Sequence, residues 1–292
     1  MTTDIMTTEI VANLSQIATR YDAVFCDVWG CYHNGQAPMP DAIAALQAFR
    51  ANGGTVVLLT NAPRPETAVR AQLDAMNAPR DSYDVIASSG AAARDAVRSG
   101  DWGKRVYHIG APKDDPFFEN ANVERVRLED AETVVCTGLR DDRTETVDDY
   151  VDELREASLR GLRFLCANPD LVVDVGELRL YCAGALAAKY RELGGIVVEY
   201  GKPHPQIYDY ARKVLTETAG REIPDHRILC IGDGIRTDVK GAMGEDLDCL
   251  FVTGGLAAHE VGDSRGDVDP MRLKTYLDSH VMAPRFAIPL LA

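Results

Sequence analysis

The chain has 292 residues, with 31 basic and 45 acidic side chains and a formal net charge of −14 at pH 7. At roughly 150 residues per domain, this length predicts about two domains. An apolar fraction of 46% is ordinary for a globular protein and excludes a chain that is disordered throughout. The acidity argues against nucleic-acid binding through a general electrostatic field, because a phosphate backbone needs a positive face. A small anionic ligand needs only local positive charge or a metal.

We find no targeting or membrane signal. The first residues include Asp4 and Glu9 and no basic segment, so we expect no secretory signal. Apolar stretches such as 56–59 are far shorter than the ~20 residues that a membrane helix needs. The 7 cysteines are scattered without a C-x-x-C pair, and we interpret them as reduced, mostly buried small side chains. These observations predict a cytoplasmic protein.

Short β-branched runs alternate with helical patterns along the chain, which is typical of α/β units around a parallel sheet. Strands are predicted over 23–28, 55–60, 84–88, 105–110, 133–138, 163–168, 227–233 and 249–254. Helices are predicted over 41–53, 66–76 and 146–161, and another opens at 201–205. We therefore expect an α/β fold with a doubly wound, Rossmann-like parallel-sheet core.

The middle of the chain carries much of the negative charge. Residues 113–155 contain 14 acidic and 6 basic side chains, which by itself is typical of a solvated helix face. The segment also looks like a self-contained α/β unit. We therefore predict a core formed by residues 1–89 and 196–292, with an inserted α/β cap domain over residues 90–195.

An open parallel sheet binds ligands outside the carboxyl ends of its strands, so the residues after each predicted strand are informative. Polar side chains stand at these ends or just before the next strand: Asp27, Thr60, Asn61, Lys202, Asp233 and Asp238. Carboxylates can hold Mg²⁺, a hard cation that prefers oxygen ligands. A carboxylate beside Mg²⁺ can attack phosphorus, because the metal offsets the repulsion between the two anions. Hydroxyl, amide and ammonium groups can bind phosphate oxygens.

These residues occur in an ordered set of motifs: D-x-x-G after an apolar strand, T-N after the second strand, G-K-P-x-P, and G-D-x-x-x-T-D. The set resembles the haloacid dehalogenase superfamily. It is most similar to the class IIA branch, which includes the p-nitrophenyl phosphatase and sugar-phosphate phosphatase types. The segments 168–170 (N-P-D) and 182–186 are similar to elements of the cap in that branch. The resemblance covers nearly the whole chain.

The resemblance implies a Mg²⁺-dependent phosphohydrolase that works through an aspartyl-phosphate. Asp27 matches the nucleophile, and Lys202 matches the lysine that neutralises the phosphate. Asp233 matches the carboxylate that binds the metal, and Asp238 a further acidic residue that supports the metal site.

Further positions match the substrate-binding part of the family. Thr60 matches the hydroxyl that binds the transferring phosphate, with Asn61 as its neighbour in the substrate cleft. Asn168 and Asp170 either reach the substrate from the cap or form a simple Asn-Pro-Asp turn. Arg64 is either a surface residue or a source of positive charge near the cleft.

The sequence departs from the family pattern at Trp29. Phosphatases of this superfamily place a second aspartate there, which protonates the leaving group and then activates water. Tryptophan can do neither, since it offers only an indole N–H. The Trp29 backbone carbonyl remains able to ligate Mg²⁺, and His33 is a nearby group that could replace the missing acid or base. General acid–base help is worth ~10²–10⁴-fold in rate.

Two functions therefore stay open. The first is a Mg²⁺-dependent phosphatase acting on a small phosphate ester. The second is a module that binds Mg²⁺ and phosphate esters with little or no turnover and serves as a sensor or partner protein. A dinucleotide-dependent oxidoreductase is disfavoured, because no G-x-G-x-x-G follows a strand. As partners we expect a small phosphorylated metabolite, neither nucleic acid nor a membrane, and we leave a homodimer as an open prediction.

Overall fold

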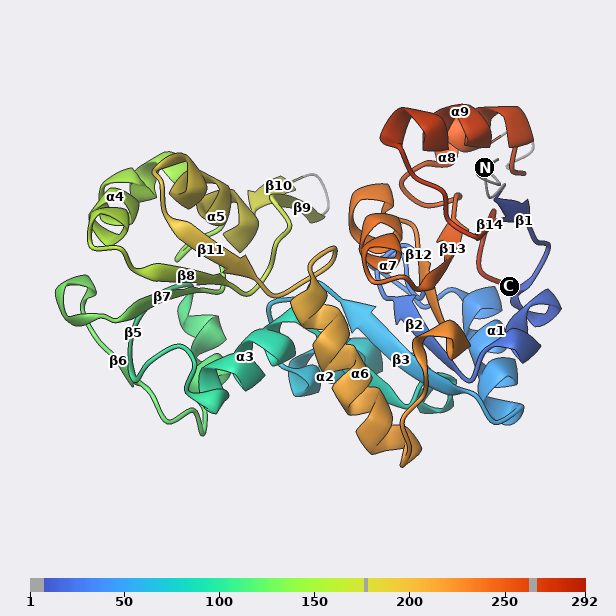
Figure 1. Cartoon of the computed structure of the whole chain (residues 1–292), viewed down its shortest axis with the longest axis horizontal. Helices are drawn as coiled ribbons and strands as arrows, with labels where there is room; N and C mark the ends of the chain where they lie inside the picture. The colour runs from blue at the N-terminus through green and yellow to red at the C-terminus, as the bar shows by residue number, and fades with distance from the viewer. Residues whose placement is uncertain (1–7, 176–177, 263–266) are drawn as a thin grey trace, which may run out of the picture. The chain divides into compact units, whose positions relative to one another are not determined.

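The computed structural model describes residues 8–175, 178–262 and 267–292 (Figure 1). The chain divides into two compact units. The core unit consists of Met1–Thr60, Arg70–Ala87 and Tyr208–Ala292, and the cap unit of Asn61–Val69 and Ser88–Ile207.

The core unit is built on one sheet, with seven strands among the described residues. In spatial order these are β1 (Glu9–Ile10), β14 (Phe286–Ile288), β13 (Asp248–Val252), β12 (Ile228–Gly232), β2 (Ala23–Asp27), β3 (Thr55–Thr60) and β4 (Val85–Ser88). Every residue of β2 and β12 is buried. Burial on both faces is why these strands read as continuous apolar runs rather than as alternating patterns.

The strand order of the core sheet reverses beside β2. The chain runs from β2 to β3 to β4 in one direction, then resumes with β12 on the other side of β2 and continues to β13 and β14. The pairs β2–β3, β2–β12 and β12–β13 are parallel. This arrangement is a doubly wound sheet, which confirms the predicted fold class. The carboxyl ends of β2 and β12 are neighbours at the switch point.

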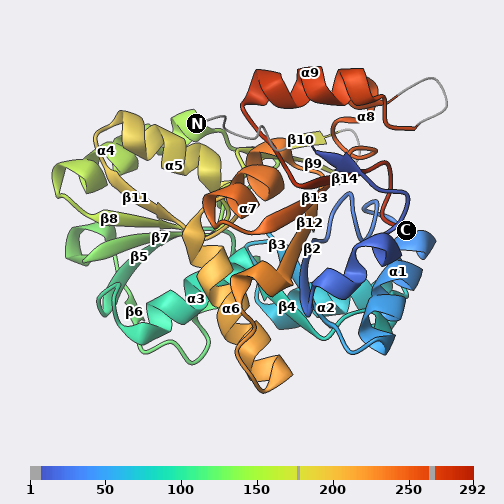
Figure 2. The same ribbon diagram turned by 45° about the vertical axis from the view of Figure 1, so that its right-hand side comes forward.

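Helices flank the core sheet. They are α1 (Pro40–Ala51), α2 (Glu66–Ala75), α6 (Pro205–Ala219), α7 (Lys240–Gly244), α8 (Ala258–Val261) and α9 (Pro270–His280), with short turns η1 (Leu14–Gln16), η2 (Ala18–Arg20), η3 (Arg80–Ser82), η7 (Asp225–Arg227) and η8 (Ile235–Val239). Pro270 opens α9 with a preset φ, and the Asp269 carboxylate accepts hydrogen bonds from the first-turn N–H groups. The helix lies beside β13 (Figure 2), where Tyr276 stacks on Phe251 at 6.2 Å between ring centroids.

The cap unit has its own parallel sheet, separate from the core sheet. Its spatial order is β11 (Ile196–Glu199), β8 (Arg163–Cys166), β7 (Thr133–Cys136), β5 (Arg105–Ile109) and β6 (Glu124–Arg125). All four neighbouring pairs are parallel, so the residues that follow β5, β7, β8 and β11 stand at one edge. A separate antiparallel hairpin joins β9 (Val172–Val175) to β10 (Leu178–Tyr181).

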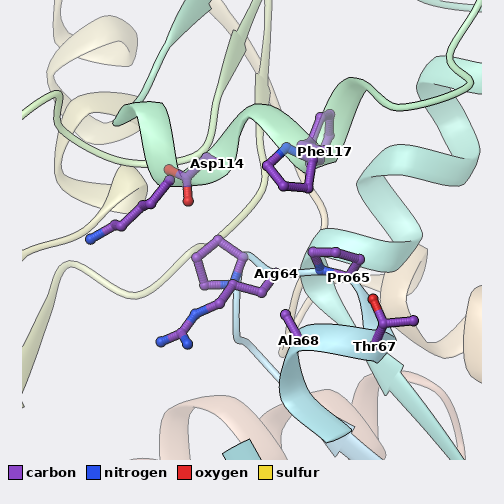
Figure 3. Close-up of a pocket in the computed structure, with 9 residues that line it drawn as sticks. Arg64, Pro65, Thr67, Ala68, Asp114 and Phe117 are labelled. Atoms are coloured by element: carbon purple, nitrogen blue, oxygen red, sulfur yellow. The ribbon is translucent and has the colours of Figure 1, made fainter. Parts of the chain in front are cut away.

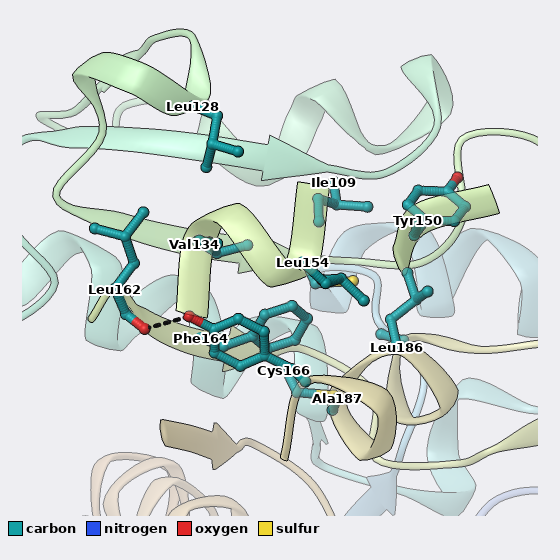
Figure 4. Packing of buried hydrophobic residues seen from close by; sticks show 14 of the residues in the cluster. Ile109, Leu128, Val134, Tyr150, Leu154, Leu162, Phe164, Cys166, Leu186 and Ala187 are labelled. Carbon is teal, nitrogen blue, oxygen red and sulfur yellow. Dashed lines mark hydrogen bonds between the residues drawn. The ribbon is translucent and has the colours of Figure 1, made fainter. Parts of the chain in front are cut away.

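Both faces of the cap sheet are covered. The helical elements are α3 (Ser89–Ser99), α4 (Val151–Leu159) and α5 (Ala183–Glu192), with the turns η4 (Pro112–Phe118), η5 (Leu128–Asp130) and η6 (Val147–Tyr150). Successive strand residues point to opposite faces. Val134 and Phe164 pack in the cluster under α4 and α5 (Figure 4), whereas Val135 and Leu165 pack in the cluster that includes α3. In the first cluster the Tyr190 hydroxyl donates to the Leu162 carbonyl at 2.6 Å.

The strands predicted from the sequence are all present, with ends that differ by one or two residues. The prediction missed β11, the short strands β1, β6 and β14, and the hairpin. β1, β6 and β14 have two or three residues, too few to show a hydrophobic period. Length does not separate β11 and the hairpin strands from the predicted strands, since β4, β7 and β8 also have four residues. The predicted domain limits at 89/90 and 195/196 stay a prediction beside the division described above.

The sequence predicts that the cysteines are reduced and mostly buried. All seven cysteines are buried thiols, as expected for small apolar side chains.

Among the described residues, no helix is both long enough and apolar enough to cross a membrane.

Candidate active site

An aspartate stands at each strand end of the switch point. Asp27 is the last residue of β2, and Asp233 directly follows β12. Thr60 is the last residue of β3, one position beyond Leu59, which is paired with Asp27. The core unit therefore brings three of the predicted residues to the sheet edge at which open α/β sheets bind ligands.

Asp27 and Asp233 form a buried cluster with Cys31. One side-chain ligand atom from each of the three lies within 4.8 Å of the other two. Two glycines leave room for Asp233, since a Cβ on Gly30 would stand 2.4 Å from Asp233 Oδ2 and one on Gly255 only 2.0 Å from it. A side chain at either glycine would displace the carboxylate, so the loops around Asp233 are shaped to hold it close to the backbone.

The donor set of this cluster fits Mg²⁺. Burial, followed by the charges of Asp27 and Asp233, raises the pKa of the Cys31 thiol well above its ordinary value. The thiol is therefore neutral, which argues against a cysteine nucleophile and against a thiolate site for a soft metal. Two adjacent carboxylates remain, and these are ligands that a hard cation prefers. Among the described residues, these three form the one group with metal-ligand spacing.

Trp29 lies in a tight loop after β2, between Asp27 and Cys31 of this cluster. The Gly30 N–H donates to the His33 carbonyl at 2.8 Å, and the His33 N–H donates to the Val28 carbonyl at 2.9 Å. Gly30 has a φ of 86°, a conformation that favours glycine. The Trp29 side chain is 50% exposed. Backbone hydrogen bonds thus hold the loop, and the half-buried indole lies beside Gly35, where an added Cβ would stand 3.1 Å from the indole Nε1. Ligation of Mg²⁺ by the Trp29 carbonyl stays a prediction.

His33 is buried in the same loop. Its Nδ1 accepts a hydrogen bond from the Gly35 N–H at 3.0 Å. Burial lowers the pKa of His33 below its ordinary value, so the ring is neutral at pH 7. With Nδ1 occupied, only Nε2 is left to exchange a proton. The structure therefore gives His33 a structural role in the loop.

Asp238 supports the loop after β12 rather than joining the close cluster. Its Oδ2 accepts hydrogen bonds from the Gly234 N–H at 3.0 Å and from the Thr237 hydroxyl at 3.2 Å. A Cβ on Gly232 would meet the Asp238 side chain at 2.2 Å. These contacts fix the turn that carries Asp233. Support of a metal site by Asp238 stays a prediction.

In the cap unit, Asn61 holds the backbone on both sides of Lys202. The Asn61 Oδ1 accepts from the Lys202 N–H at 2.7 Å, and its Nδ2 donates to the Lys202 carbonyl at 3.1 Å. Lys202 is 3% exposed, and an ammonium that deeply buried stays charged only near negative groups. The side-chain amide of Asn61 is thus committed to the Lys202 loop. A phosphate contact from Asn61 stays a prediction.

The Asn-Pro-Asp segment forms a turn in the cap unit. The Asn168 Oδ1 accepts from the Asp170 N–H at 3.0 Å, and the Asp170 Oδ1 accepts from Asn61 Nδ2 at 2.9 Å. Pro169 packs at Gly201, where a Cβ would meet the proline ring at 2.4 Å. The turn therefore braces Asn61 and the loop of Lys202. A direct substrate contact from Asn168 or Asp170 stays a prediction.

Sequence reasoning missed Glu199, which braces the same loop from the other side. This buried residue ends β11, and its Oε2 lies 2.8 Å from His204 Nε2 across the Gly201–Pro203 segment. Arg191 also pairs with it. Burial raises the pKa of Glu199, but the bonds from His204 and Arg191 outweigh it and hold the pKa below its ordinary value. A glutamate at the end of the short apolar run 196–198, two residues before G-K-P, was the available signal.

Asp233→Asn is expected to weaken Mg²⁺ binding by about two orders of magnitude, because a carboxamide donates one neutral oxygen in place of a charged one. Titration calorimetry with MgCl₂ would measure the dissociation constant in both proteins. Asp152→Asn is a matched control, since the Asp152 side chain is fully exposed in α4. Equal affinity in Asp233→Asn and the parent protein would remove Asp233 from the metal site.

Comparisons with known proteins define the class of this protein. A family model described as haloacid dehalogenase-like hydrolase matches residues 24–124, and a second, HAD-hydrolase-like, matches residues 199–272. A solved hydrolase of the haloacid dehalogenase-like family from Brucella suis 1330 is 40% identical, with a TM-score of 0.81 over 97% of this chain and 100% of that one. The chain belongs to the haloacid dehalogenase-like hydrolase family, which confirms the resemblance found in the motifs.

More distant structures share the fold. A possible sugar phosphatase from Cytophaga hutchinsonii is 18% identical, with a TM-score of 0.76 over 98% of this chain and 99% of that one. NagD from E. coli K-12 is 22% identical, with a TM-score of 0.71 over 92% of this chain and 96% of that one. A search of curated proteins gave no match.

Proposed function

We propose that this protein is a Mg²⁺-dependent phosphohydrolase that acts on a small phosphate ester through an aspartyl-phosphate on Asp27. The observation that carries the proposal is the buried pair of Asp27 and Asp233 at the switch point of a hydrolase-family core. Distant structures with this fold are described as sugar and 4-nitrophenyl phosphatases, which supports a phosphate ester as the substrate class. Bound Mg²⁺ would supply charge neutralisation between the nucleophile and the phosphate.

The protein groups then divide the reaction between them. An Asp27 carboxylate oxygen attacks phosphorus, a new P–O bond forms to Asp27, and the bond to the leaving-group oxygen breaks. The Thr60 hydroxyl would donate to the transferring phosphoryl group, and Lys202 would neutralise its charge. Water then attacks the phosphorus of the aspartyl-phosphate, which releases inorganic phosphate and returns the Asp27 carboxylate. The side chain at position 29 supplies no proton in either half-reaction.

The test is turnover of p-nitrophenyl phosphate with and without Mg²⁺. We expect nitrophenolate release that requires Mg²⁺ and stops when EDTA removes the metal. Without Mg²⁺, the negative charges of the Asp27 carboxylate and of the phosphate repel each other, and this repulsion blocks the attack on phosphorus. Phosphate release, measured in the same reaction, should equal nitrophenolate release at long times. Release that is equal with Mg²⁺ and with EDTA would contradict the proposal.

A binding module with negligible turnover is the second candidate, and Trp29 is the observation that favours it. The exposed indole occupies the position at which the family phosphatases carry their acid–base aspartate. This candidate predicts Mg²⁺-dependent binding of a phosphate ester by calorimetry and no phosphate release from that ester.

A further inference from the structure

The cap unit contains a pocket of about 250 Å³ that the proposed mechanism does not use (Figure 3). One wall is residues 63–68, the segment that leads from Asn61 into the first turn of α2. The other wall is η4, which follows β5 of the cap sheet. Asp114 and Arg64 lie on one side of the pocket in Figure 3, and Phe117, Pro65 and Thr67 lie on the other. The pocket thus has a charged side and a largely apolar side.

Asp114 is oriented from inside the cap. The Thr137 hydroxyl donates to Asp114 Oδ2 at 2.9 Å, and His108 Nε2 lies 3.0 Å from the same hydroxyl. Burial lowers the pKa of His108 to about 4, so the ring is neutral. Because the Thr137 hydroxyl gives its proton to Asp114, its oxygen accepts from His108, which therefore carries its proton on Nε2. Burial also raises the pKa of Asp114, against the opposing bond from Thr137. A carboxyl group held in this way is positioned to bind a hydroxyl or amine group of a ligand.

Arg64 is the cation available to a ligand. Its carbonyl is fixed by the Ser88 hydroxyl at 2.6 Å, so the backbone that carries the side chain is anchored. The guanidinium has no hydrogen bond or ion pair to any residue within the described ranges. Lys113, the second cation of the pocket, is instead paired with Asp142 at 2.8 Å. A guanidinium binds carboxylate or phosphate oxygens through two parallel hydrogen bonds.

The pocket and the Lys202 loop lie along one edge of the cap sheet. Lys202 follows β11 and Asp114 follows β5, and these strands are separated by β8 and β7. Three strand spacings amount to about 14 Å. Arg64 is three residues from Asn61, which holds the Lys202 loop, and three residues span at most about 11 Å. These lengths are of the order of a sugar phosphate, so we take that size as the class of ligand that would reach from the Lys202 loop to the pocket.

We propose that this pocket is a subsite for the leaving group, and that it selects sugar-sized phosphate esters with a second anionic group at the end remote from the phosphate. Arg64 pairs with that anionic group, and Asp114 binds a neighbouring hydroxyl. Because Lys113 is paired with Asp142, Arg64 is the cation that the pocket lining offers to a second anion. The inference rests on the proposed phosphohydrolase function.

The experiment compares two acyclic probes, 6-phosphogluconate and sorbitol 6-phosphate, which differ only in a carboxylate or a CH₂OH group remote from the phosphate. We expect the parent protein to prefer 6-phosphogluconate by about tenfold or more in kcat/KM. Arg64→Gln should lower that preference by about 10–100-fold, the effect of losing hydrogen bonds to a charged group, whereas Arg64→Lys should retain part of it. Arg127→Gln is the matched control, because Arg127 is 80% exposed and pairs with nearby Glu129.

Binding to Asp27→Asn separates the two proposals. This variant cannot turn over, so calorimetry with both probes measures the subsite alone. Tighter binding of 6-phosphogluconate that disappears with Arg64→Gln supports the subsite even if the parent protein hydrolyses nothing. Equal binding of the two probes, or an equal loss of both with Arg64→Gln, overturns it even if p-nitrophenyl phosphate is hydrolysed.

Discussion

Asp27→Asn is expected to reduce phosphatase turnover by about four to six orders of magnitude, the loss found when a hydrolase loses its nucleophile. A carboxamide is a poor nucleophile and leaves no carboxylate to be regenerated from the intermediate. Steady-state release of nitrophenolate from p-nitrophenyl phosphate with Mg²⁺ measures the effect. Asp27→Ala should give the same result, and it excludes recovery of activity through deamidation.

The folded state should survive this change. Asp27 lies close to Asp233 in a buried cluster, and like charges at that distance destabilise each other. Removing one charge therefore leaves the melting temperature in metal-free buffer unchanged or higher. A variant that is folded and inactive identifies Asp27 as the nucleophile. Turnover within about tenfold of the parent rate would show that the reaction does not pass through Asp27.

The sequence predicted the parts of the site that end long buried strands. Asp27 and Asp233 interrupt continuous apolar runs, and a carboxylate at that point has no role in packing the core. The same logic located Thr60 at the end of β3. Strand length explains why β1, β6 and β14 were missed, because two or three residues cannot carry a period. It does not explain β11, which is as long as the predicted strands β7 and β8.

Contacts between distant segments could not be predicted in this way. Asn61 is 141 positions from Lys202, and only the folded chain reveals that its amide holds both the N–H and the carbonyl of that residue. Glu199 and His204 are near neighbours in sequence, but their pairing depends on the path of the loop between them. The Arg64 pocket depends likewise on the packing of residues 63–68 against η4. The chemical type of a residue at a strand end can be read from the sequence, whereas the orientation of its side chain depends on tertiary contacts.

Trp29→Asp is expected to raise the steady-state rate by about 10²–10⁴-fold, the usual contribution of a general acid or base. Formation of the aspartyl-phosphate needs Asp27 and Lys202, both of which the chain has. Hydrolysis of the intermediate needs a base to activate water, and Trp29 cannot supply one. With a good leaving group the first step loses little, so hydrolysis of the intermediate should limit the rate in the parent protein.

The kinetic signature is a burst. Rapid mixing of the parent protein, Mg²⁺ and p-nitrophenyl phosphate should release about one equivalent of nitrophenolate per active site, followed by slow steady turnover. Trp29→Asp should shrink the burst as its steady rate rises. Trp29→Asn is the matched control, because it has the shape of aspartate without the ability to take a proton, and it should keep the burst and the slow rate.

The loop around position 29 makes this comparison interpretable. Backbone hydrogen bonds from Gly30 to His33 and from His33 to Val28 hold it, and these bonds do not depend on the side chain at position 29. Replacing Trp29 should therefore change the chemistry without unfolding the loop. A parent protein with a linear trace and fast turnover would require another base. The neutral His33 ring, with only Nε2 available, would then be the group to replace next. If neither the parent protein nor Trp29→Asp released nitrophenolate, the result would instead favour the binding module. Supplying the missing base would then have produced no catalytic activity.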